Sequence, residues 1–158
     1  MKCRTLAVTA LVVCAGLAQA VAKTPPSVPA TGSPYLFVWA GDDARKSSDF
    51  LAVIDANPSS ASYGRIVSSL PVGTSGSMPH HTEYEFPKNN LLFADGWVAG
   101  HTFIFDLSQP LKPRIAAQFQ DRAGYSFPHS FVRLANGDVL ATFQSHGGSL
   151  AADGGLVE

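Results

Sequence analysis

The stretch FLAVIDANP, residues 50–58, returns in outline as TFIFDLSQP at residues 102–110. Each stretch is a short apolar run that ends at an aspartate and is followed by a turn and a proline. This is the composition of a β-strand that leaves into a tight turn, where the aspartate caps the backbone. The two aspartates, Asp55 and Asp106, are 51 positions apart. We therefore assign them a structural role and expect a repeat of about 50 residues built from strands.

The repeat continues beyond these two stretches. Strands led by a basic residue, RIV at 65–67 and RIA at 114–116, come next. They are followed by MPHH at 78–81 and FPHS at 127–130, whose prolines are 49 positions apart. A third copy begins with GGLVE at 154–158, where the sequence stops inside an apolar strand. This ending predicts a truncated chain or a piece of a longer protein.

Short strands bounded by Gly, Pro, Asn or Asp predict an all-β fold, since no helical apolar period of useful length follows residue 20. The expected strands span residues 35–39, 50–54, 65–72, 91–93, 102–105, 114–119 and 139–143. Four strands per repeat of this length are typical of a β-propeller blade. We expect a partial β-propeller over residues 35–158, with about two four-stranded blades. An antiparallel sandwich made from two copies is the competing architecture.

The first 20 residues have the composition of a signal peptide. Lys2 and Arg4 precede an apolar run at residues 6–17, and AQA at 18–20 matches a small-residue cleavage site. The run is shorter than the roughly 20 residues that cross a bilayer. We expect cleavage after Ala20 and a periplasmic or secreted protein; a retained N-terminal anchor is the alternative.

The composition of the chain after residue 20 excludes several classes of function. Residues 21–34, rich in Pro, Ser and Thr, predict a linker. Cys3 and Cys14 both lie in the leader, which leaves no cysteine for disulfides or thiolate ligands. Without its two leader cations the chain has 9 basic residues against 12 acidic ones, a net charge of −3. The sequence has no stripe of basic residues of the kind that binds nucleic acid. It also has no second apolar run of the kind that crosses a membrane. The oligomeric state is not indicated.

Histidines are the strongest candidates for chemistry. His80 and His129 occupy the same repeat position, each after a proline. In a propeller such positions on neighbouring blades converge near the axis, and imidazole is a common ligand of copper, zinc and iron. His81 adds a further ring, but adjacent residues of a regular strand face opposite ways. It can join only if the strand is broken near Pro79. The alternative is ordinary surface or hydrogen-bonded histidines.

Other polar residues have weaker patterns. His101 precedes an apolar strand, and we expect it to lie away from the other histidines. His146 lies in a glycine-rich loop that could hold a ligand. Glu83 and Glu85 would share one strand face, either as partners of histidine N–H groups or as a solvated face. Phosphate-binding loops, G-x-G-x-x-G and G-x-S-x-G motifs are absent from the sequence.

Six segments in this order are similar to the selenium-binding protein family, which includes bacterial methanethiol oxidases. They span residues 35–39, 49–58, 63–67, 70–72, 79–84 and 127–130. The resemblance runs from about Tyr35 to Glu158. It implies a propeller and a copper-dependent oxidation of methanethiol, with oxygen and water, to formaldehyde, hydrogen sulfide and hydrogen peroxide. It implies His80, His81 and His129 as metal ligands, while no catalytic residue is assigned.

One departure from the family bears on function. The cysteine associated with selenium binding in animal members has no counterpart here. The alternative is a non-catalytic propeller that serves as a scaffold or as a selenium- or metal-binding module. Because family members are much longer, we expect this chain by itself to be inactive.

Overall fold

The computed structural model describes residues 33–150 and 153–158, which form ten β-strands and no helix. The strands are β1 (Tyr35–Ala40), β2 (Phe50–Asp55), β3 (Ile66–Pro71), β4 (Pro79–Thr82), β5 (Leu91–Gly96), β6 (His101–Asp106), β7 (Arg114–Phe119), β8 (Tyr125–Arg133), β9 (Val139–His146) and β10 (Gly155–Val157). The predicted signal peptide and nearly all of the predicted linker lie outside the described residues. Within those residues no helix could span a membrane.

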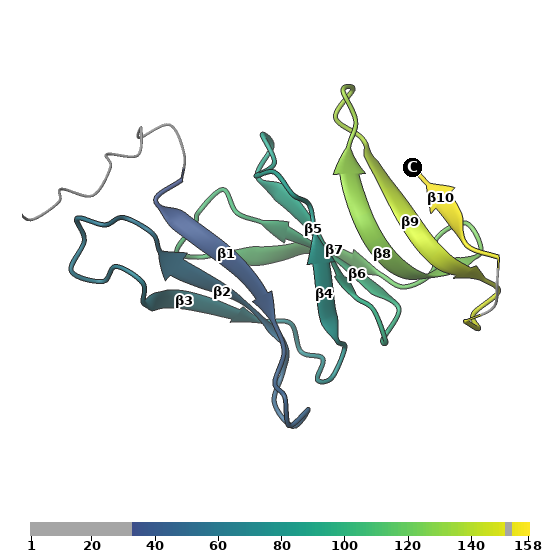
Figure 1. Ribbon diagram of the computed structural model, residues 1–158, viewed down its shortest axis with the longest axis horizontal. Coiled ribbons are helices and arrows are strands. Elements are labelled where there is room, and N and C mark those ends of the chain that lie inside the picture. The colour runs from purple at the N-terminus through teal and green to yellow at the C-terminus, as the bar shows by residue number, and fades with distance from the viewer. Residues whose placement is uncertain (1–32, 151–152) are drawn as a thin grey trace, which may run out of the picture.

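The strands form three antiparallel sheets, ordered β1-β2-β3, β4-β5-β6-β7 and β10-β9-β8. The sheets stand side by side in chain order (Figure 1). Strand β4 contacts both β1 and β8, and β8 also contacts β5 and β6 of the central sheet. Sheets made from consecutive strands and set next to one another are the arrangement of propeller blades. The predicted all-β fold is confirmed.

The division into sheets differs from the expected two four-stranded blades. Asp55 ends β2 and Asp106 ends β6, so β2 corresponds to β6 and β1 corresponds to β5. Among the described residues, the first sheet therefore has no counterpart of β4, and the third has no counterpart of β7. The repeat that is visible in the sequence begins at a third strand and straddles two sheets.

Strands β4 and β8 were not among the expected strands. Each contains a proline, Pro79 or Pro128. Proline has no N–H to donate to a neighbouring strand, so its presence in a sequence argues for a turn rather than a strand. Pro79 begins β4, and Pro128 lies where the pairing of β8 with β9 becomes irregular. Both are positions at which a strand tolerates proline.

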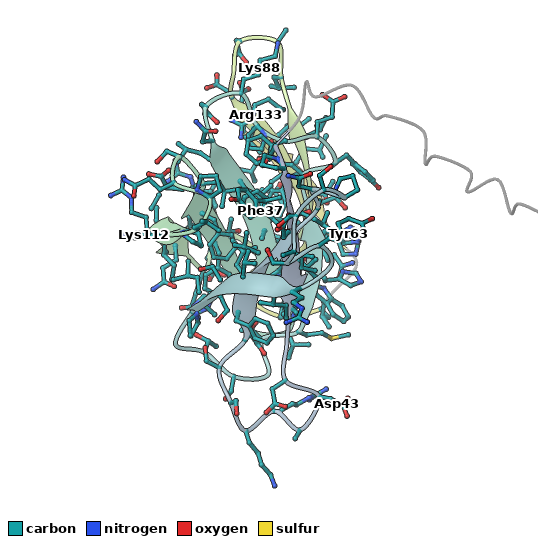
Figure 2. All side chains as sticks on the ribbon, turned by 90° about the vertical axis from the view of Figure 1, so that its left-hand side faces the viewer. Phe37, Asp43, Tyr63, Lys88, Lys112 and Arg133 are labelled. Atoms are coloured by element: carbon teal, nitrogen blue, oxygen red, sulfur yellow. The ribbon has the colours of Figure 1, made fainter. Side chains whose placement is uncertain are left out.

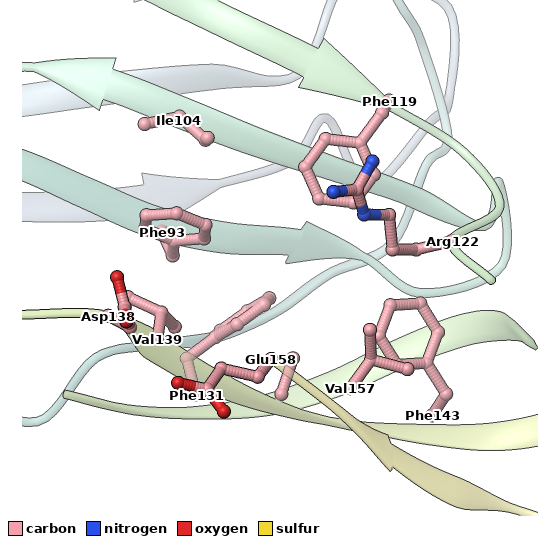
Figure 3. Close-up of a pocket in the computed structure, with 11 residues that line it drawn as sticks. Phe93, Ile104, Phe119, Arg122, Phe131, Asp138, Val139, Phe143, Val157 and Glu158 are labelled. Carbon is pink, nitrogen blue, oxygen red and sulfur yellow. The ribbon is translucent and has the colours of Figure 1, made fainter. Parts of the chain in front are cut away.

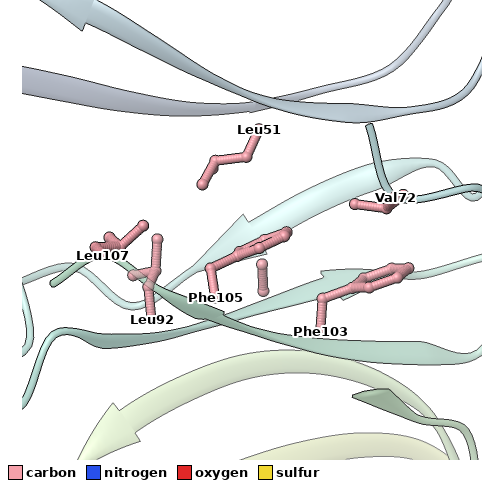
Figure 4. Close-up of a cluster of buried hydrophobic side chains, with 7 residues drawn as sticks. Leu51, Val72, Leu92, Phe103, Phe105 and Leu107 are labelled. Carbon is pink, nitrogen blue, oxygen red and sulfur yellow. The ribbon is translucent and has the colours of Figure 1, made fainter. Parts of the chain in front are cut away.

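Two apolar cores hold the sheets together. The larger lies between the first and central sheets and contains Leu51, Val72, Leu92, Ala94, Phe103, Phe105 and Leu107 (Figure 4). The smaller lies between the central and third sheets and contains Phe131, Ala141 and Phe143, with Phe93 and Phe119 packed against them. In a side view, Phe37 lies among the crowded central side chains, whereas Asp43 and Lys112 lie at the periphery (Figure 2).

Polar contacts complete the turns. Asp55 Oδ1 accepts the Asn57 N–H at 2.9 Å, and Asp106 Oδ1 accepts the Ser108 N–H at 2.9 Å. The structural role predicted for these repeat-equivalent aspartates is confirmed.

Candidate metal centre

Three histidine rings converge where the central and third sheets meet. His80 and His81 lie on β4, and His129 lies on β8. The ring centroids are 4.3 Å apart for His80 and His81, 4.8 Å for His80 and His129, and 4.4 Å for His81 and His129. One ring nitrogen from each residue lies within 4.8 Å of the others. The expected meeting of His80 and His129 is observed, and His81 joins them.

A β-bulge lets the adjacent His80 and His81 share this site. Pro79 pairs with Gly96 and Thr82 pairs with Ala94, so β4 advances three residues while β5 advances two. The extra residue breaks the alternation that would send neighbouring side chains to opposite faces. The break near Pro79 that sequence analysis required is therefore present.

The third sheet repeats this bulge. Pro128 pairs with Phe143 and Phe131 pairs with Ala141, again three residues against two. The residue before each proline has a positive φ, 61° at Met78 and 58° at Phe127. Residues other than glycine rarely adopt such a backbone angle, and those that do cluster at functional sites. Both strands thus carry the same uncommon backbone beside their histidines.

The environment favours neutral imidazoles. Burial, and then the neighbouring His80, lowers the pKa of His81 below its usual value. Burial also lowers the pKa of His129, with smaller contributions from the other two rings. A neutral ring has a nitrogen lone pair available for a metal. The Nδ1 of His129 lies 3.0 Å from Ser130 Oγ, a contact of the kind that fixes the orientation of a metal-binding ring.

Trp97 forms one wall of the cluster. Its ring stacks on His80 with a centroid distance of 5.7 Å and an interplanar angle of 29°. Its Nε1–H donates to Gln144 Oε1 of β9 at 2.6 Å, which ties the wall to the third sheet. Sequence analysis missed Trp97 because it lies in the turn after β5, far from either histidine motif.

A buried carboxyl group lies behind the bulge. Asp95 on β5 is fully buried, its Oδ1 accepts the His81 N–H, and its Oδ2 has no partner among the described residues. Burial raises the pKa of Asp95 to about 7, against the opposing effect of backbone hydrogen bonds. Sequence analysis also missed this residue, although an aspartate followed by glycine at the end of an apolar strand is visible in the sequence.

The remaining histidines lie elsewhere. His101 begins β6 and packs edge-on against Phe103 at 5.5 Å, outside the cluster as expected. His146 ends β9 and packs against Tyr125 at 5.0 Å. It does not join the group of three histidines.

The shared strand face expected for Glu83 and Glu85 was wrong, and of the two residues only Glu85 has the solvated position that was one of the alternatives. Both follow β4 rather than lying within it, so they share no strand face. The buried Glu83 carboxylate accepts hydrogen bonds from Arg133 and from the Phe93 N–H instead of a histidine. Glu85 is exposed. The signal missed was Arg133, 50 residues away, which only the tertiary structure brings to Glu83.

A cavity of about 700 Å³ lies between the central and third sheets and is lined in part by residues of the smaller apolar core. Apolar side chains from both sheets line it, with Arg122, Asp138 and Glu158 as its charged members (Figure 3). Its lining includes neither a histidine nor Trp97, so it is distinct from the candidate metal centre.

Comparisons with known proteins agree with this architecture. No family model matches the sequence. The chain is 36% identical over 109 residues to a methanethiol oxidase from a Hyphomicrobium species, an alignment that covers 63% of this chain and 24% of the relative. It is 26% identical over 109 residues to selenium-binding protein 1 of Arabidopsis thaliana, covering 60% of this chain and 22% of the relative.

A solved structure gives the same answer for the fold. The crystal structure of a hypothetical selenium-binding protein from Sulfolobus tokodaii aligns with a TM-score of 0.59 at 21% identity. The alignment covers 70% of this chain and 28% of that one. The chain thus spans about a quarter of the length of the relatives it matches.

Proposed function

We propose, from the homology of this chain to a segment of the selenium-binding protein and methanethiol oxidase family, that His80, His81 and His129 bind copper in a methanethiol oxidase. The observation that carries the proposal is the convergence of three imidazoles from two sheets. Their ligand atoms lie within 4.8 Å of one another, which is compatible with one shared cation.

The donor set fits a transition metal. Imidazole nitrogens suit copper, zinc, iron and nickel, whereas magnesium and calcium prefer oxygen ligands. Zinc has no redox chemistry, so an oxidase favours copper or iron, and the family resemblance favours copper. When bound, the metal would supply the path by which electrons leave the thiol for oxygen.

The residues of this chain perform the supporting work. His81 and His129, with lowered pKa values, offer unprotonated nitrogens at neutral pH. His80 is exposed, which leaves the cluster open on one side to a small thiol and to oxygen. The proposed reaction converts methanethiol, oxygen and water to formaldehyde, hydrogen sulfide and hydrogen peroxide, in which all atoms balance.

A second candidate is a non-catalytic module that binds selenium or a metal. The Arabidopsis relatives, named selenium-binding proteins, favour it. The sequence has no cysteine after Cys14, which argues against selenium capture by a thiolate in the described part of the chain. The two candidates differ in turnover rather than in the histidine cluster.

The experiment uses the full-length gene product, with copper content and thiol-dependent peroxide measured together. His80→Ala or His129→Ala should each weaken copper binding by more than the roughly 10–100-fold loss that follows when a residue hydrogen-bonded to a metal ligand is replaced. Peroxide and sulfide production should fall in parallel. His101→Ala is the matched control, because this histidine lies outside the cluster, and it should change neither quantity.

Three outcomes separate the candidates. Copper lost together with peroxide production supports the oxidase. Copper lost from a protein that makes no peroxide, even as wild type, supports the binding module. Full copper occupancy in both His80→Ala and His129→Ala would refute the shared site.

A further inference from the structure

We propose that Asp95 and Thr142 are positioning residues of the histidine cluster, each holding the bulge that turns a histidine-bearing strand toward the site. Asp95 Oδ1 accepts the His81 N–H on the central sheet. Thr142 Oγ1 accepts the Ser130 N–H at 2.9 Å on the third sheet. The geometric part of the proposal stands alone, and the consequence for metal binding rests on the proposed function.

The two acceptors occupy equivalent positions. Asp95 lies between Ala94 and Gly96, the residues of β5 that pair with Thr82 and Pro79 on either side of the bulge. Thr142 lies between Ala141 and Phe143, which pair with Phe131 and Pro128 in the same way. In both sheets the acceptor thus stands opposite the extra residue of the neighbouring strand.

The hydrogen bond from a bulge N–H to a side-chain oxygen recurs with different residues, which indicates that the hydrogen bond matters more than the residue type. The donor is the second residue after the proline in each case, His81 or Ser130. One acceptor is a carboxyl oxygen and the other is a hydroxyl oxygen. The contact is thus retained at the same register in two sheets although its donor and acceptor residues have changed.

A bulge needs such an acceptor for a physical reason. Its extra residue has no ladder partner on the neighbouring strand, so one N–H is left over. An N–H that is shielded from water and lacks an acceptor is destabilising. Without the side-chain oxygen, regular pairing becomes the better alternative, and a shift of one residue sends side chains to the opposite face. In β4 that shift would separate His80 from His81.

Asp95 is also bound by a residue of the first sheet. The indole Nε1–H of Trp39 on β1 donates to the Asp95 carbonyl oxygen at 2.7 Å. Trp39 in turn packs on Phe103 and Phe105 at centroid distances of 5.3 and 5.4 Å. The backbone of Asp95 is therefore fixed by the larger core while its side chain fixes the bulge.

Paired substitutions test each position. Asp95→Asn and Thr142→Ser keep an acceptor oxygen, whereas Asp95→Leu and Thr142→Val remove it at similar volume. Thr102→Val is the control, since Thr102 is a buried threonine of β6 whose Oγ1 has no partner among the described residues, whereas Thr142 is partly buried and its Oγ1 is an acceptor. All variants are made in the full-length gene product and checked for cooperative unfolding.

The first readout needs no metal. Hydrogen exchange, resolved to single residues by fragmentation mass spectrometry, follows the His81 and Ser130 amides in the copper-free protein. Asp95→Leu should speed exchange at His81 at least tenfold, and Thr142→Val should do so at Ser130. Asp95→Asn, Thr142→Ser and Thr102→Val should stay within about threefold of wild type.

The second readout is the copper(II) site itself. The nitrogen splitting in the electron paramagnetic resonance spectrum counts the bound imidazoles. Asp95→Leu should lose one nitrogen and bind copper 10–100-fold more weakly, while Asp95→Asn keeps both properties. A structural role alone would lower stability without changing the nitrogen count.

The outcomes are separable. If Asp95→Leu folds with wild-type exchange at His81, the proposal is wrong. If Asp95→Leu does not fold, the milder Thr142→Val decides by exchange at Ser130. If the wild type binds no copper but the exchange pattern holds, the proposed function fails while the positioning role stands.

Discussion

Replacing Arg133 with methionine should destabilise the protein more than replacing any other described arginine that forms an ion pair. The Arg133 Nε–H and Nη2–H donate to the two oxygens of Glu83, each at 2.9 Å. Nη2–H also donates to the Leu91 carbonyl at 2.8 Å, and Nη1–H to the Gly137 carbonyl at 2.9 Å. This one side chain of β8 therefore binds three segments.

The magnitude follows from burial. The Glu83 side chain is 4% exposed and that of Arg133 is 25% exposed. Removing one member of a buried pair leaves the other charge uncompensated, which costs about 3–5 kcal/mol. Such a loss is a large part of the 5–15 kcal/mol that stabilises a typical domain. The lost stability should weaken the contact between the central and third sheets, because the Glu83–Arg133 pair connects them.

Arg114 supplies the matched control. It also pairs with a carboxylate, Asp106, but its side chain is 76% exposed. Exposed pairs contribute about 0–1 kcal/mol. Arg114→Met should therefore cost at most about 1 kcal/mol.

The assay is urea unfolding of the full-length gene product, followed by far-ultraviolet circular dichroism. The double variant Glu83→Gln/Arg133→Met should be more stable than the two single losses predict, because it leaves no unpaired charge. If Arg133→Met and Arg114→Met cost the same within about 0.5 kcal/mol, burial does not govern the Glu83 pair and the reasoning fails.

Three further predictions concern other parts of the chain. Hydrogen bonds, chiefly from Ser108, lower the pKa of Asp106 to about 2, so its stabilising effect is present above pH 3.8 and is lost as the pH falls toward 2. The difference in urea midpoint between wild type and Asp106→Asn should thus be constant above pH 5 and shrink below pH 4; an unchanged difference at pH 3 would contradict this. Gly96→Ala should cost about 1–3 kcal/mol, because its Cβ would lie 2.8 Å from the buried Ser77 side chain, and a thermal melt equal to wild type would exclude that clash. The exported protein should begin at Val21, and N-terminal sequencing that finds Met1 would count against the leader.

Much of the fold could be predicted from sequence because its signals are local. Apolar runs that end at Asp55 and Asp106 mark strands whatever they pair with, and their spacing reveals the repeat. The recurrence of histidine after proline predicted that His80 and His129 would meet. Their equivalence is a property of the repeat and needs no knowledge of side-chain packing.

The rest depends on tertiary context. The bulge in β4 exists only through its register with β5, so the inclusion of His81 could be stated only as a condition. Glu83 reads as a surface residue until Arg133 is placed beside it from another sheet. Asp95 and Thr142 are different residue types, and only the strand pairing shows that both accept a hydrogen bond from a bulge N–H at equivalent positions.

The offset between repeat and sheet has an evolutionary consequence. A duplication of the 50-residue unit that begins at β2 would copy the end of one blade together with the start of the next. Each added unit would then arrive already interlocked with both neighbours, and the number of blades could change without leaving a sheet divided. Each new copy would also bring its own proline, bulge and histidine to the contact between neighbouring sheets. The addition of a sheet and the addition of a histidine would thus be one genetic event.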